Sequence, residues 1–230
     1  MSVFKTVTDT TPSEEFPILQ ALYQINNGTH SHLIEPLRKL IAEGNTESYS
    51  EAKKKLPSFT PCGTFEGTRK AENLKSYSCF VILDIDKLTP EQVQQVKEKA
   101  MASPFSFSAF ISPSGNGLKI LVRVNSKPGE HTNAFNQLKV LYEKEIGVEI
   151  DKSGKDLSRL CFFSYDSKIY INEQASVYIL TYETPPPVKQ SQHSTFTAAP
   201  LGADAFEKCV QLTENKVQFV EGSRNNFVHL

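Results

Sequence analysis

The chain has 230 residues, of which 39% are hydrophobic and 15 are phenylalanine, so it is long enough to bury a core. This composition excludes an intrinsically disordered protein. The formal net charge of -1 excludes a global field that would hold nucleic acid, so such a partner needs a local basic groove or metal ions. The four cysteines show no zinc-binding spacing. With no signal-peptide region near the N-terminus and no long apolar stretch, we expect a cytoplasmic protein with reduced thiols and no membrane partner.

The first part of the chain is expected to be helical. Residues 14–56 place Leu33, Ile34, Leu37, Leu40 and Ile41 at helical spacing. A turn-rich segment at 56–65 separates this helical portion from the first strong strand signal, at residues 78–85. We expect the helical portion to flank the sheet that this strand begins.

After that strand, the pattern alternates between helices and strands. Thr89, Pro90 and Gln92 form a capping sequence that predicts a helix over 90–101. Strands are predicted at 105–111 and 118–124, followed by a helix over 131–146 with Phe135 and Leu138 on one face.

The second helix leads to a short predicted strand that ends at Ile150-Asp151, and further strands are predicted at 159–164, 169–172 and 176–181. This order is typical of a ferredoxin-like or RRM-like unit. We therefore predict a mixed α/β (α+β) fold with a mainly antiparallel sheet. Its helices cover one face, and its other face is open and carries the site.

Composition also predicts the domain boundaries. Residues 1–182 form the main domain, and residues 183–201 are rich in proline, serine and threonine, which indicates an extended linker. Residues 202–230 are too few to bury a core of their own. We expect them to dock on the main domain or, as we favour, to begin a further helical region of a longer protein.

The apolar strand predicted at 78–85 ends in two carboxylates that are spaced two residues apart, Asp84 and Asp86. Strand side chains alternate between faces, so Asp84 and Asp86 point the same way, roughly 7 Å apart. Such a pair is typical of a site for a hard divalent cation such as Mg²⁺ or Mn²⁺, which indicates phosphate chemistry. The simpler interpretation is that both residues begin the polar turn at 87–89.

The segment SPSGNG at 112–117 joins two apolar strands. Its Asn116-Gly117 pair predicts a hairpin with a type I′ turn. The hydroxyl of Ser114 and the open backbone at Gly115 and Gly117 also offer a binding site for phosphate. A hairpin needs such glycines in any case, so the segment alone does not decide between the two interpretations.

Beyond the hairpin, strand alternation places Lys119 and Arg123 on one face, opposite the apolar side chains of residues 118–124. One face of this strand is therefore expected to be cationic.

A third candidate cluster combines Asp151 with Arg159. Asp151 closes a predicted strand as Asp84 does, and a third carboxylate would complete a site for two cations. The guanidinium of Arg159 suits the outer phosphates of a nucleotide. Asp156 is a rival for the metal role, and a surface ion pair in a polar loop is the simpler interpretation.

Taken together, these segments resemble a known family. The order of a strand ending in Asp-x-Asp, a SPSG-x-G-x-Lys/His segment, and an Asp followed eight residues later by Arg is similar to the archaeo-eukaryotic primase and primase-polymerase superfamily. More narrowly, the phrases LPSFTPCGTF, ILDIDKL, SPSGNGLKILV and DLSRLCFFSYD resemble the N-terminal domain of the virulence-associated E (VirE-like) proteins of Bacteroides. This similarity covers roughly residues 50–182. The EGSRNNF segment near the C-terminus resembles the start of a primase C-terminal helical domain.

The resemblance implies template-directed nucleotidyl transfer in DNA replication of a mobile element. Asp84, Asp86 and Asp151 would be the catalytic residues and would hold two Mg²⁺ or Mn²⁺ ions. Ser114, Gly115, Gly117, Lys119 and Arg159 would bind the nucleoside triphosphate. The implied partners are nucleoside triphosphates and single-stranded or primed nucleic acid, and a helicase-like domain would follow in a longer chain.

One residue departs from the family pattern. Active members of the superfamily usually have histidine at the position of Lys119. Lysine can hold a phosphate, but it cannot both donate and accept a hydrogen bond as a neutral imidazole does. A catalytically inactive module that binds nucleic acid or nucleotide is therefore the main alternative, and a metal-dependent nuclease is a weaker one.

Overall fold

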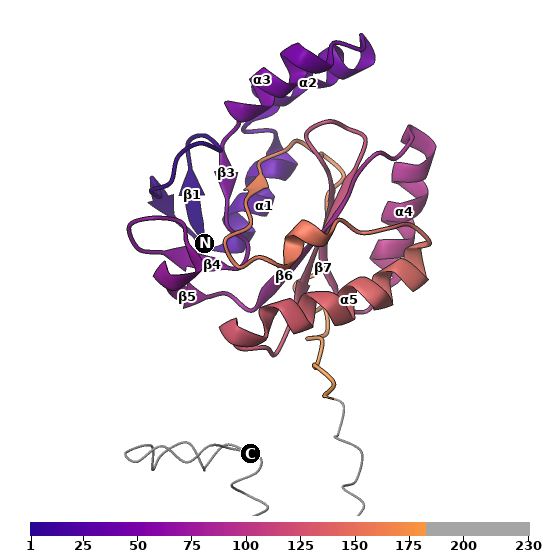
Figure 1. The fold of residues 1–230 in the computed structure, drawn as a ribbon. Coiled ribbons are helices and arrows are strands. Elements are labelled where there is room, and N and C mark those ends of the chain that lie inside the picture. Colours follow the sequence, from indigo (N-terminus) through magenta and orange to yellow (C-terminus); the bar gives the residue numbers. More distant parts are fainter. Residues whose placement is uncertain (183–230) are drawn as a thin grey trace, which may run out of the picture. The chain divides into compact units, whose positions relative to one another are not determined.

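The strand that ends in the candidate metal ligands lies at the edge of a four-stranded antiparallel sheet (Figure 1). In the computed structural model, which describes residues 1–182, this sheet has the order β10-β7-β8-β6. Its strands are β6 (Phe80–Ile85), β7 (Ser106–Ile111), β8 (Leu118–Arg123) and β10 (Tyr170–Ile171). Neighbouring strands pair antiparallel throughout, as the sequence predicts.

Two helices cover one face of this sheet (Figure 1). They are α4 (Pro90–Ala102) and α5 (His131–Ile146), and both predicted helices are confirmed to within a residue. The predicted capping box of α4 forms between Thr89 and Gln92. Both helices bury their apolar faces against the outer face of β6 and β8, in a cluster that includes Val81, Leu83, Ile120, Val96 and Leu138.

The opposite face of the sheet is closed, and the prediction of an open face is wrong. Phe80, Ile82 and Leu121 are buried there against α1 (Ile18–Asn27) and against Phe59 and Phe163. The run at 79–83 is apolar at successive positions, which is typical of a strand that is buried on both faces. The site therefore lies at the end of the strands and not across an open sheet.

The layer on that second face comes from both ends of the domain. Its sheet has the order β2-β1-β3-β9, with β1 (Ser2–Phe4), β2 (Glu14–Glu15), β3 (Ser58–Phe59) and β9 (Cys161–Phe162). The predicted helical portion is confirmed as α1, α2 (Ser31–Ala42) and α3 (Thr46–Lys54). A third, two-stranded sheet joins β4 (Gly63–Phe65) to β5 (Leu74–Tyr77). Within residues 1–182 the fold is thus mixed α+β, with five α-helices and three antiparallel sheets.

Two of the predicted strands are absent from residues 1–182. The segment before Asp151 is irregular, although the Asp151 N–H donates one hydrogen bond of 2.8 Å to the Asp84 carbonyl of β6. In the segment 176–181, only Tyr178 makes a β-bridge, to Val124. The predicted strand at 159–164 is shorter than expected and pairs in the second sheet as β9.

Gly154, in the segment that follows α5, allows this segment to pack closely against the central sheet. A Cβ added at Gly154 would lie 2.5 Å from the Ile82 carbonyl oxygen and 2.6 Å from the Phe135 ring. We expect Gly154→Ala to lower the free energy of unfolding by about 2 kcal/mol, because neither the strand backbone nor the packed ring can move aside cheaply. Chemical denaturation measures this change.

Gly129→Ala is the matched control, since a Cβ at Gly129 would meet nothing within 4 Å. We expect this control to unfold within about 0.5 kcal/mol of the wild-type protein. Equal stability of the two variants would contradict the close approach at Gly154.

The predicted linker at 183–201 and the predicted helical region at 202–230 lie outside the described residues, as does Cys209. Among the residues described, Cys62, Cys79 and Cys161 are free thiols, as predicted. None of the helices described combines the length and the apolar character that crossing a membrane requires.

Candidate metal and phosphate site

Three carboxylates meet at one end of the central sheet. Asp84 lies on β6, Asp86 follows directly after it, and Asp151 precedes the short 3₁₀ helix Lys152–Lys155. Each carboxylate offers one oxygen, and these atoms all lie within 4.8 Å of one another. The structure thus brings together the three aspartates that the sequence identified. Asp156, the rival ligand, instead lines the neighbouring pocket and accepts hydrogen bonds from Ser158.

Asp84 is the buried member of this acidic triad. Its Oδ2 atom accepts a hydrogen bond of 2.6 Å from the Lys119 ammonium and a longer one, 3.4 Å, from Arg159. Its Oδ1 atom is also buried but has no hydrogen-bond partner in the described part of the chain. A buried carboxylate oxygen without a partner is costly, so a bound cation would supply a missing interaction.

Lys119 faces Asp84 because the two residues pair directly across β6 and β8. Only 7% of the Lys119 side chain is exposed. Burial, the largest single effect, acts to lower the pKa of this ammonium. The charge of Asp84, its hydrogen bond with Lys119 and the charges of other nearby groups, Asp86 among them, together outweigh burial, so the pKa is raised. Lys119 therefore stays charged and neutralises much of the Asp84 charge.

The other two carboxylates are exposed. Partial removal from water and the nearby charge of Asp84 raise the pKa of Asp86. Hydrogen bonds from the Ser153 N–H and hydroxyl, together with the charge of Arg159, lower the pKa of Asp151. A cation from solvent can thus contact two of the three carboxylates, Asp86 and Asp151, while the site stays folded.

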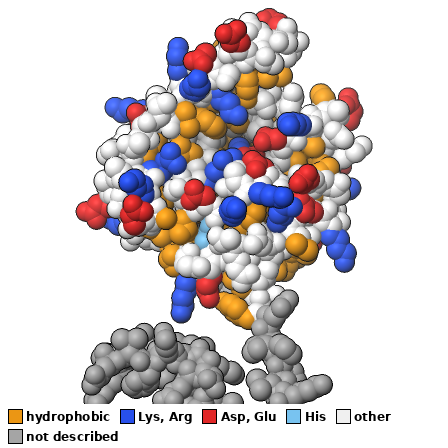
Figure 2. Space-filling view, viewed as in Figure 1, with side chains coloured by type: hydrophobic (Ala, Val, Ile, Leu, Met, Phe, Trp, Pro, Cys, Tyr) orange, Lys and Arg blue, Asp and Glu red, His pale blue; other side chains and the backbone are white. Residues whose placement is uncertain are grey.

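A pocket of about 310 Å³ opens beside Asp84 and Asp86. Acidic and basic side chains are interspersed over the face of the molecule that Figure 2 shows. The lining combines groups from α3, from the hairpin turn, from β6 and β8, and from residues 156–162. Its charged and hydroxyl-bearing members are Tyr49, Lys53, Arg69, Asp84, Asp86, Ser112, Ser114, Lys119, Asp156, Ser158 and Arg159. Such a mixture of carboxylates and cations suits a metal-bound phosphate ester.

The hairpin turn at 112–117 forms, but not as a type I′ turn. Only Gly115 has a positive φ, of 81°, so the prediction for Asn116-Gly117 is wrong. The chain closes instead through a hydrogen bond from the Ser112 N–H to the Gly117 carbonyl. A six-residue connection leaves room for a wider turn, so a two-residue turn geometry is not needed.

Within this turn, the predicted phosphate residues separate into two groups. Ser114 lines the pocket, whereas Gly115 and Gly117 do not. A side chain at Gly117 would press against the Ile85 carbonyl, so this glycine serves the close approach of the turn to β6. Arg38 of α2 holds the turn in place by donating hydrogen bonds to the Ser112 and Tyr165 carbonyls.

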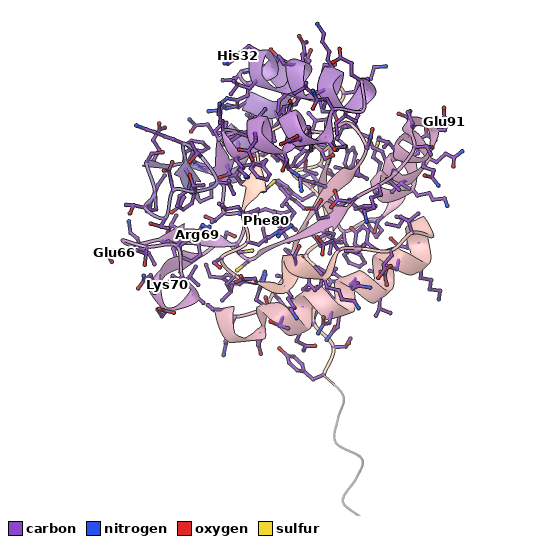
Figure 3. All side chains as sticks on the ribbon, turned by 45° about the horizontal axis from the view of Figure 1, so that its top comes forward. His32, Glu66, Arg69, Lys70, Phe80 and Glu91 are labelled. Carbon is purple, nitrogen blue, oxygen red and sulfur yellow. The ribbon has the colours of Figure 1, made fainter. Side chains whose placement is uncertain are left out.

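Tyr49, Lys53 and Arg69 are among the pocket residues that were not identified from the sequence. Tyr49 and Lys53 lie one helical turn apart on α3, and Arg69 lies in the segment that joins β4 to β5 (Figure 3). The Arg69 guanidinium donates a 2.8 Å hydrogen bond to the Ser158 carbonyl and stacks over Phe4. The i, i+4 spacing of Tyr49 and Lys53 was a usable signal that both share one helix face. No sequence pattern indicates that this face meets the acidic triad.

The fold and the site define a class of protein: a mixed α+β domain with an acidic triad at a pocket that both carboxylates and cations line. A family model, the BT4734-like N-terminal domain, matches residues 51–171, just over half of the chain. The chain belongs to the BT4734-like N-terminal domain family. Searches of curated proteins and of solved structures gave no match.

Proposed function

We propose that this domain is a primase-polymerase-like nucleotidyltransferase that acts in the replication of a mobile element. The observation that carries the proposal is the convergence of Asp84, Asp86 and Asp151 within 4.8 Å, with the buried Asp84 Oδ1 atom left without a partner in the described chain. The sequence resemblance to primase-polymerases, stated above, supports the same conclusion.

The acidic triad fits a hard divalent cation. Its ligand atoms are all carboxylate oxygens, which Mg²⁺ and Mn²⁺ prefer, and two of the residues are open to solvent. When bound, such ions activate a primer 3′-hydroxyl and stabilise the charge that develops on a leaving pyrophosphate. Asp84, Asp86 and Asp151 would hold them.

The cationic side of the pocket suits the triphosphate. The Arg159 side chain is one-third exposed, and its guanidinium lies 3.7 Å from the Asp151 carboxylate. It can therefore turn to a phosphate without leaving the acidic triad. Ser114 adds a hydroxyl to the lining, from the hairpin turn.

One observation favours a second candidate function, binding of a nucleotide or nucleic acid without chemistry. The ammonium of Lys119 lies 2.6 Å from Asp84, so it already occupies one oxygen of the buried carboxylate. The buried Lys119 ammonium therefore competes with a second metal ion for the negative charge of Asp84. A domain with one weakened metal position would still bind a phosphate-bearing ligand.

Calorimetric titration with a nucleoside triphosphate in Mn²⁺ tests the site. We expect Asp86→Asn to weaken this binding about 100-fold or more, because a direct ligand is lost. Its side chain is exposed, so the fold should be unaffected. Glu145→Gln removes the same charge from an exposed position on α5 that lines neither this pocket nor the one beside it, so it should bind as the wild-type protein does.

Incorporation of a labelled nucleotide on a primed template then separates the two candidates. Incorporation by the wild-type protein and not by Asp86→Asn supports the transferase, whereas binding without incorporation supports the non-catalytic module. Absence of metal-dependent binding in the wild-type protein would contradict both. Nicking of DNA without added nucleotide would identify a nuclease instead.

A further inference from the structure

Lys53 is held over the pocket by aromatic rings. Its Nζ atom lies 5.7 Å from the centre of the Tyr49 ring and 5.3 Å from the centre of the Phe162 ring. Tyr49 belongs to the same helix, α3, whereas Phe162 belongs to β9. Two rings from distant parts of the chain thus orient one ammonium, which lines the pocket beside the acidic triad.

The Lys53 ammonium makes no hydrogen bond or ion pair with another side chain in residues 1–182, in contrast to its neighbour Lys54, which pairs with Glu51 at 2.6 Å. Half-burial lowers the pKa of Lys53, and the positive charges of Lys119 and Arg159 act on it in the same direction. Asp86 and Asp84 oppose this effect. Lys53 is therefore a partly desolvated cation with unused donors.

We propose that Lys53 binds the outer phosphates of the incoming nucleoside triphosphate and that it gives the pocket its preference for triphosphates over monophosphates. This inference rests on the proposed function, and it adds a residue of α3, Lys53, to the pocket residues that the sequence motifs identified. An ammonium with three free donors suits terminal phosphate oxygens, which carry the most charge.

The positions of the cations in the pocket lining favour a ligand with several phosphates. Arg159 and Lys119 lie next to the acidic triad, where the phosphate that reacts would sit. Lys53 contributes from α3, a separate wall of the same pocket. A monophosphate bound at the metal ions does not need this second contact, whereas a triphosphate has two further phosphates to place.

The adjacent lysines of α3 provide a matched pair of variants. Lys53→Met keeps an unbranched apolar stem on the two rings and removes only the charge, so the fold is retained. Lys54→Met makes the same chemical change one residue away, on a side chain that is 55% exposed. Lys53→Arg restores the charge and tests rescue.

The experiment is calorimetric titration of the whole protein and these three variants with a nucleoside triphosphate and with the corresponding monophosphate, both in Mn²⁺. We expect Lys53→Met to weaken triphosphate binding about tenfold, as is typical for one charge-assisted contact, and to change monophosphate binding less than about twofold. Lys54→Met should match the wild-type protein, and Lys53→Arg should recover most of the affinity.

Two negative results remain distinguishable. If the wild-type protein binds the triphosphate and Lys53→Met binds it equally well, the role of Lys53 is overturned and the proposed function stands. An equal loss for both ligands would also overturn the preference for triphosphates. If the wild-type protein binds neither ligand, both the proposed function and the role of Lys53 are overturned.

Discussion

Lys119→Met is expected to lower the free energy of unfolding by about 3 kcal/mol, because it leaves the buried Asp84 carboxylate without its closest counter-charge. Only 8% of the Asp84 side chain is exposed, and its remaining cation, Arg159, lies farther away, at 3.4 Å. The free energy of unfolding, measured with a chemical denaturant, gives the result directly. A loss below about 1 kcal/mol would contradict the importance of this pair.

The same variant tests the cation site by linkage. A ligand that binds only the native state raises the free energy of unfolding, and at a given ligand concentration the increase grows with the logarithm of the affinity. Removing the Lys119 ammonium frees the Asp84 carboxylate, so Mn²⁺ should stabilise Lys119→Met more than the wild-type protein. Equal stabilisation of the two proteins by Mn²⁺ would contradict competition between Lys119 and the cation for the Asp84 carboxylate.

Lys97→Met is the second change with a large expected effect, again a loss of about 3 kcal/mol in the free energy of unfolding. Lys97 of α4 and Asp166 are 6% and 4% exposed, and their ion pair is 2.6 Å long. Asp166 also accepts a hydrogen bond from the Ile111 N–H, at the end of β7. The variant therefore leaves a buried charge at the junction of helix, strand and loop. Chemical denaturation measures the loss.

Two further variants control this result. Lys99→Met, on the same helix, removes an ammonium whose one hydrogen bond within residues 1–182 is to the Ile146 carbonyl, and we expect a loss below about 1 kcal/mol. Adding Asp166→Asn to Lys97→Met should recover part of the stability, because the unpaired charge is then gone. A strictly additive double variant would contradict a direct interaction between the two side chains.

Sequence periodicity predicted the elements that are long enough to show it. The helix α5 and the strands β6, β7 and β8 each contain six or more residues, and their apolar positions repeat at the expected spacing. The strands β1, β2, β3 and β9 contain only two or three residues, which is too few to show a period. The closed second face of the sheet was missed because those short strands build it.

Prediction of the candidate site was limited in the same way. Asp84, Asp86 and Lys119 lie on or next to regular strands, so their relative placement follows from the pairing of β6 with β8. Tyr49, Lys53 and Arg69 reach the pocket only through tertiary packing of α3 and the β4–β5 connection. Such packing has no local signature, since it depends on which distant surfaces meet.

The second sheet has a consequence for how the protein is made. Ser58 of β3 pairs with Phe162 of β9. About a hundred residues separate these two strands in the sequence, so their pairing is a contact of high sequence separation. A chain emerging from the ribosome cannot close this sheet until β9 has been synthesised. Asp151 and Arg159 emerge just before β9, so a nascent chain completes its second layer and its pocket at nearly the same moment.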